Sequence, residues 1–96
     1  MLKVAVHPGE VLKEELDELD VTPTELARQI EVPANRLSQI IAGKRGVTAD
    51  TALRLGHWFG TDPQFWMNLQ AQFDLAGADR AAGKTIQALP TAENAA

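Results

Sequence analysis

The chain contains no cysteine and no tyrosine, only two histidines, and no long run of apolar residues. Without cysteine, neither a disulfide framework nor a thiolate zinc site can form. No apolar stretch approaches the roughly 18 residues of a membrane span, and the first residues lack the apolar region of a secretory signal. We therefore expect a cytoplasmic protein with no membrane partner.

The same shortages argue against an enzyme. His7 and His57 lie far apart in the sequence, and neither is surrounded by a nucleophile and an acid at a catalytic spacing. The chain shows no phosphate-binding loop and no cluster of metal ligands. We expect no catalytic residue, no metal and no cofactor, and we interpret both histidines as structural or surface residues.

Ninety-six residues are enough for one small domain with a modest core. Helical periodicity, with start and stop signals, predicts helices over residues 8–19, 23–30, 33–42, 49–59 and 63–82. The predicted fold class is all-α, a compact five-helix domain over residues 1–82 with a flexible, mostly unstructured tail over residues 83–96. Residues 1–6 are predicted to be an extended arm, and residues 85–89 have the composition of a short strand.

The segment from Thr22 to Arg45 has the signals of two short helices joined by a tight turn. Thr22 is a good N-cap, and Glu25 three residues later completes a capping box. Pro33 interrupts the first helix, because a proline disfavours helical geometry in the residue before it. Gly43 is expected to end the second helix in a left-handed conformation.

The second of these helices divides into two faces. Leu37, Ile40 and Ile41 point one way, and the opposite face carries Asn35, Ser38, Gln39 and Ala42. Asn and Gln can bond to adenine edges in the major groove, while Lys and Arg can hold phosphates. The pattern therefore predicts a helix-turn-helix whose second helix contacts DNA. The alternative is an ordinary solvated surface.

The net charge of −4 is unevenly distributed along the chain. Residues 28–54 carry five basic side chains against two acidic ones, and this is the segment that contains the predicted helix-turn-helix. Residues 1–27 carry seven acids against two bases. Five of these acids crowd the end of the first helix: Glu14, Glu15, Asp17, Glu18 and Asp20. They either face a basic partner or form a solvated surface.

The helix predicted over residues 63–82 has an unusually wide apolar face, formed by Phe65, Trp66, Leu69 and Phe73. A small five-helix core has limited room for so many large side chains. Large apolar patches left on a surface usually mark an interface, so this face is the candidate dimer surface. The alternative is that all of these rings belong to the core.

Three stretches of the sequence resemble the HigA-type antitoxins of HigBA toxin–antitoxin modules, within the phage-repressor-like (XRE, lambda-repressor-like) helix-turn-helix regulators. They are HPGEVLKEEL, ELARQIEVPANRLSQIIAGKRGVTADTALRL and FGTDPQFWMNLQAQFDL. The resemblance implies a homodimer that binds a palindromic double-stranded operator, represses its own operon and neutralises a HigB-type, mRNA-cleaving toxin. Since solitary relatives exist, the alternative is a stand-alone transcriptional regulator without a toxin.

By residue match, the resemblance places Ala34, Asn35, Ser38 and Gln39 at base-facing positions. It places Arg36, Lys44 and Arg45 at phosphate-facing or groove-edge positions. The position of Ala34 often carries a larger polar group in repressors. Thr22 and Thr24 complete the predicted DNA contacts, although the cap role of Thr22 is structural in the first place. For the acidic group on the first helix, the resemblance makes a basic toxin the expected partner.

Overall fold

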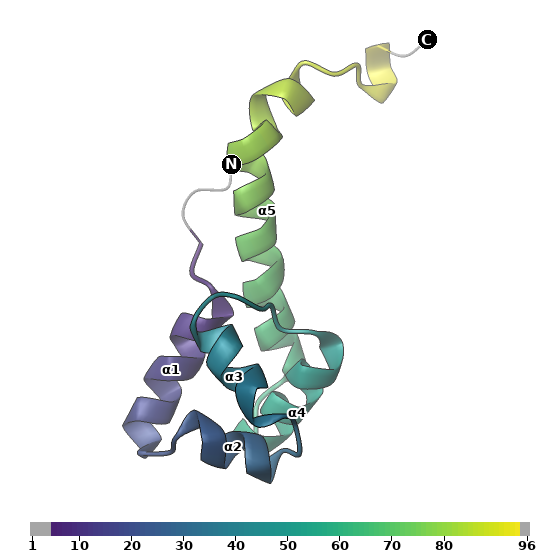
Figure 1. Cartoon of the computed structure of the whole chain (residues 1–96). Coiled ribbons are helices and arrows are strands. Elements are labelled where there is room, and N and C mark those ends of the chain that lie inside the picture. The colour runs from purple at the N-terminus through teal and green to yellow at the C-terminus, as the bar shows by residue number, and fades with distance from the viewer. Residues whose placement is uncertain (1–4, 95–96) are drawn as a thin grey trace.

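The computed structural model describes residues 5–94 and contains five α-helices followed by one turn of 3-10 helix (Figure 1). The elements are α1 (Pro8–Leu19), α2 (Pro23–Gln29), α3 (Ala34–Ile41), α4 (Ala49–Phe59), α5 (Pro63–Gln87) and η1 (Ala92–Asn94). Between residues 5 and 94 there is no strand, so the all-α prediction is confirmed. The first four helices begin and end within one residue of their predicted bounds. Most of the predicted N-terminal arm, residues 1–4, lies outside the described residues.

Side-chain caps start four of the five helices, as local sequence signals predicted for three of them. The hydroxyl of Thr22 accepts a hydrogen bond from the Glu25 N–H at 3.1 Å, Thr48 caps α4 and the carboxylate of Asp62 caps α5. The fourth cap is His7, whose Nδ1 accepts from the Gly9 N–H at 2.9 Å. His7 is therefore a structural residue, as expected.

The predicted capping box at the start of α2 is only half formed. The Glu25 N–H donates to the Thr22 hydroxyl, but the Glu25 carboxylate accepts from Arg28 and from Gln29. The reciprocal bond to the Thr22 backbone, which we expected, is therefore replaced by side-chain pairs one turn further along α2.

A single core lies where the first four helices meet the beginning of α5. It is formed by Leu12, Leu16, Leu26, Ala27, Ile30, Val32, Leu37, Ile40, Val47, Ala52, Leu55 and Trp66. Helix α1 contributes Leu12 and Leu16 to this core, whereas Leu19 at its end is 53% exposed. Helices α1 and α3 approach each other closely at Gly9, where an added Cβ would lie 1.9 Å from the Ile40 carbonyl oxygen. Only a glycine fits there, so α1 fixes the position of the last turn of α3.

Helix α5 is longer than predicted and extends away from the other four helices (Figure 1). It ends at Gln87 rather than near Ala82, and it includes residues 85–87, which we had expected in a short strand. Both expectations are wrong for the same reason: Gly83 does not terminate the helix. The predicted domain limit at residue 82 therefore falls inside α5. The molecule measures 56 Å along its longest axis and about 20 Å across.

Candidate nucleic-acid interface

Helix α3 presents its predicted polar face to solvent. Leu37 and Ile40 are fully buried, whereas Ala34, Asn35 and Ser38 are exposed on the other side. Arg36 and Gln39 are half-buried at the margins of this face. The two-faced character of α3 is therefore confirmed, and its amides and hydroxyl are accessible to a ligand.

The turn between α2 and α3 is fixed by hydrogen bonds from outside it. Glu31 adopts a left-handed conformation with φ of 59°, and the Val32 N–H returns to the Ala27 carbonyl at 3.0 Å. From α4, the Arg54 guanidinium donates to the Ile30 carbonyl at 2.8 Å and pairs with Asp50 at 2.9 Å. Arg54, one of the five bases of the positive segment, thus caps the end of α2. The Arg54 side chain therefore stabilises the turn between α2 and α3.

The loop after α3 brings Arg45 back to the polar face. Gly43 is left-handed, with φ of 75°, as predicted, and the Lys44 N–H donates to the Gln39 carbonyl at 2.9 Å. The Arg45 Nε then donates to the side-chain Oε1 of Gln39 at 2.9 Å. The far end of the loop is held by α5, because the Val47 N–H donates to the Gln70 Oε1 at 2.8 Å.

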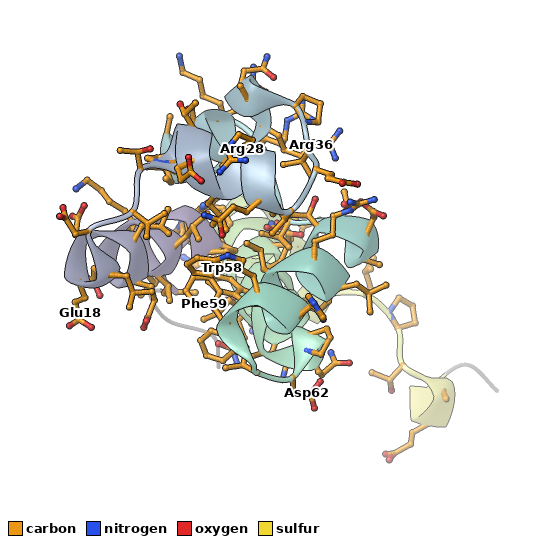
Figure 2. All side chains as sticks on the ribbon, turned by 90° about the horizontal axis from the view of Figure 1, so that it is seen from below. Glu18, Arg28, Arg36, Trp58, Phe59 and Asp62 are labelled. Carbon is orange, nitrogen blue, oxygen red and sulfur yellow. The ribbon has the colours of Figure 1, made fainter. Side chains whose placement is uncertain are left out.

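The exposed side of α2 carries Thr22, Thr24 and an ion pair between Glu25 and Arg28. The hydrogen bond from Arg28, together with that from Gln29, lowers the pKa of Glu25 below its ordinary value. Exposed pairs of this kind contribute little to stability. Figure 2 shows Arg28 on α2 and Arg36 on α3 in the upper part of the view, whereas Asp62 before the start of α5 lies in the lower part.

The acidic group of α1 is also accessible. All five predicted residues are exposed: Glu14, Glu15, Asp17, Glu18 and Asp20. Two of them have structural partners, since Asp17 pairs with Lys13 at 2.7 Å and Asp20 is the left-handed C-cap of α1. Glu18 projects from the end of α1, well separated in Figure 2 from Arg28 and Arg36. Glu18 therefore lies apart from the basic residues Arg28 and Arg36 of the predicted DNA-binding region (Figure 2).

The predicted dimer surface on α5 requires one correction. Trp66 is 2% exposed and belongs to the core, so it cannot form part of an exposed face. Phe65 is 46% exposed, whereas Leu69 and Phe73 are half-buried, with the Phe73 ring packed edge-on against His7. Leu75 and Ile86, which the sequence analysis did not select, are exposed on the same helix.

Among residues 5–94, no three His, Cys, Asp or Glu side chains are grouped so that they could hold a metal ion. In the same part of the chain, no helix combines the length and the apolar character needed to cross a bilayer.

Comparison with known proteins supports the resemblance found in the sequence. The helix-turn-helix family model matches residues 12–66, which is more than half of the chain. An addiction module antidote protein of the HigA family from Coxiella burnetii has a TM-score of 0.89 and 46% identity, and the match covers 93% of this chain and 98% of that one. The antitoxin HigA of Pseudomonas aeruginosa, solved with the higBA promoter, has a TM-score of 0.88 and 44% identity over the same shares.

A third relative was found by sequence. Virulence-associated protein I of Dichelobacter nodosus is 44% identical over 77 residues, which is 79% of this chain and 71% of the relative. The two solved structures share the fold of this chain, and the family model and this relative agree with the resemblance predicted from the sequence. The chain therefore belongs to the XRE-type helix-turn-helix family, and its structural neighbours are HigA-family antitoxins.

Proposed function

We propose that this protein is a DNA-binding antitoxin that represses its own operon and neutralises a HigB-type, mRNA-cleaving toxin. The observation that carries the proposal is the solvent-exposed polar face of α3, held in place by the buried Leu37 and Ile40 on its other side. The Pseudomonas aeruginosa relative, solved with promoter DNA, supports the DNA-binding part.

In the proposed complex, α3 lies in the major groove. Asn35 and Gln39, one helical turn apart, face the base edges together with Ser38. Arg36 and Lys44 lie beside this face and hold phosphates, which fixes the position of the protein on the duplex without selecting a sequence. The remaining proposed contacts come from the starts of α3 and α2: Ala34, Thr22 and Thr24.

We further propose that the protein acts as a homodimer on a palindromic operator. A single short helix offers few contacts, whereas two copies of α3 about 34 Å apart would bind successive major grooves. The candidate surface is the exposed part of α5, now without Trp66. It consists of Phe65 and Leu75, with the half-buried Leu69 and Phe73 beside them.

The acidic group of α1 is the proposed contact for the toxin. A toxin that cleaves RNA needs basic groups to hold phosphates, and exposed carboxylates complement them. Glu14, Glu15 and Glu18 are exposed and form no ion pair within residues 5–94. Because they lie on a different helix from the proposed DNA contacts, one molecule could hold both partners.

The test is co-purification of the protein with the product of the neighbouring gene, followed by a gel-shift assay on the DNA upstream of its own gene. Arg36→Ala should weaken the shift, and Arg80→Ala is the matched control, since it removes an exposed positive charge from α5. A shift without a co-purifying toxin would favour the stand-alone regulator. Absence of any shift, or equal effects of the two substitutions, would contradict the proposed DNA contact.

A further inference from the structure

Gln39 and Arg45 form a pair on the polar face of α3. The Nε of Arg45 donates to the Oε1 of Gln39 at 2.9 Å, across the six residues that span the end of α3. The guanidinium has no acceptor atoms, so the Gln39 atom that faces it must be the oxygen. The orientation of the Gln39 amide is therefore set by Arg45.

The backbone around this pair is held on both sides. Gly43 turns the chain through a left-handed conformation, and the Lys44 N–H returns to the Gln39 carbonyl. Beyond Arg45, the backbone of Val47 is bonded to Gln70 on α5. These contacts place the guanidinium beside Gln39 before any ligand binds. Less conformational entropy of the loop and the Arg45 side chain is then lost when a ligand binds.

The pair offers hydrogen-bond donors to a ligand. Gln39 retains its amide NH₂, and Arg45 retains its two terminal nitrogens, since within residues 5–94 it makes no other side-chain hydrogen bond. Bidentate binding of adenine needs the Gln39 oxygen to accept from the adenine N6 amino group. That oxygen accepts from Arg45 through one of its two lone pairs, and an adenine amino group brought to the other would meet the guanidinium donors. Guanine instead presents two acceptors, N7 and O6, in the major groove.

We propose that Gln39 and Arg45 act as one unit that selects guanine, and that Arg45 is a specificity-determining residue. This inference rests on the proposed function, in which α3 lies in the major groove. It replaces two expectations from the sequence, adenine for Gln39 and a phosphate or the groove edge for Arg45. If Arg45 held only a phosphate, replacing it would weaken binding to all sequences alike and leave the guanine preference intact.

The experiment selects binding sites from a pool of random-sequence duplexes with the wild-type protein and with Arg45→Ala and Gln39→Ala. Lys44→Ala is the matched control, since Lys44 is the exposed basic neighbour and its side chain has no hydrogen bond to Gln39 within the described residues. Binding of each variant is then measured on the selected site and on the same site with one guanine changed to adenine.

The wild-type protein should prefer one guanine over adenine by roughly 5- to 150-fold. Arg45→Ala and Gln39→Ala should each lose most of this preference. Lys44→Ala should bind every duplex more weakly and keep the preference. A guanine preference retained by Arg45→Ala, or adenine at the position that Gln39 contacts, would overturn this inference and leave the proposed function standing. If the wild-type protein enriches no motif, the proposed function fails as well.

Discussion

Replacing Gly9 by alanine tests the contact between α1 and α3 that positions α3. The new Cβ would lie 1.9 Å from the Ile40 carbonyl oxygen, and an ordinary contact begins near 3.4 Å, so α1 and α3 would have to separate by roughly 1.5 Å. The obstructing atoms are backbone, which cannot rotate away as a side chain can. Overpacking of this kind costs about 1–3 kcal/mol. In a chain of this size, each kcal/mol lowers Tm by about 4–8 °C.

The same carbonyl oxygen accepts the Gly43 N–H at 3.0 Å, where the loop that carries Lys44 and Arg45 begins. Gly9→Ala should therefore also weaken DNA binding, although Gly9 lies on α1. The assay is thermal unfolding followed by circular dichroism, at one protein concentration for all variants. Gly77→Ala is the matched control, because no described atom lies within 4 Å of its added Cβ. An alanine inside a helix should stabilise by about 0.5–1 kcal/mol. A Gly9→Ala protein as stable as the wild type would refute the close approach of α1 and α3.

Three further predictions concern the loop, the toxin and the dimer. Gln70→Ala should lower the free energy of unfolding by about 1–3 kcal/mol in urea titrations, because it leaves the N–H of the buried Val47 without its partner. An unchanged urea midpoint would argue against a stabilising bond between Gln70 and Val47. Reversing Glu14, Glu15 and Glu18 to lysine should slow toxin capture in surface plasmon resonance and leave the gel shift intact, whereas normal capture with tighter binding to random DNA would remove the proposed role of α1. Phe65→Ser should weaken the dimer in sedimentation experiments with little change in Tm, since the side chain is 46% exposed; an undiminished dimer would exclude this part of α5 from the interface.

Local signals in the sequence were sufficient to predict where most of the helices begin and end. Thr22, Thr48 and Asp62 cap their helices because a short polar side chain can reach an N–H in the following turn. Gly43 and Gly60 end α3 and α4 with φ of 75° and 72°, a conformation that glycine adopts without strain. The end of α5 was missed because Gly83 costs only about 1 kcal/mol inside a helix, and the surrounding residues favour helix.

The features that a local pattern could not predict are contacts between distant parts of the chain. Arg54 bonds to the end of α2 across 24 positions, and Gln70 bonds to the loop before α4 across 23. Trp66 is buried and Phe65, its neighbour in sequence, is half exposed, although both fit the wide apolar face expected for α5. The polar face of α3 was predictable because one helical period places it opposite Leu37 and Ile40, but the pairing of Gln39 with Arg45 depends on the path of the loop.

If α3 reads bases, as we propose, the binding of Asn35→Ala to DNA should reveal it. Fluorescence anisotropy at fixed salt would compare this variant with the wild-type protein, on a duplex selected by the wild type and on a duplex of random sequence. Asn35 is exposed at the start of α3 and makes no side-chain hydrogen bond within residues 5–94, so its removal should leave the fold intact. We expect a loss of about 1–3 kcal/mol on the selected duplex and little change on the random one. Equal losses on the two duplexes, or no loss on either, would contradict the account.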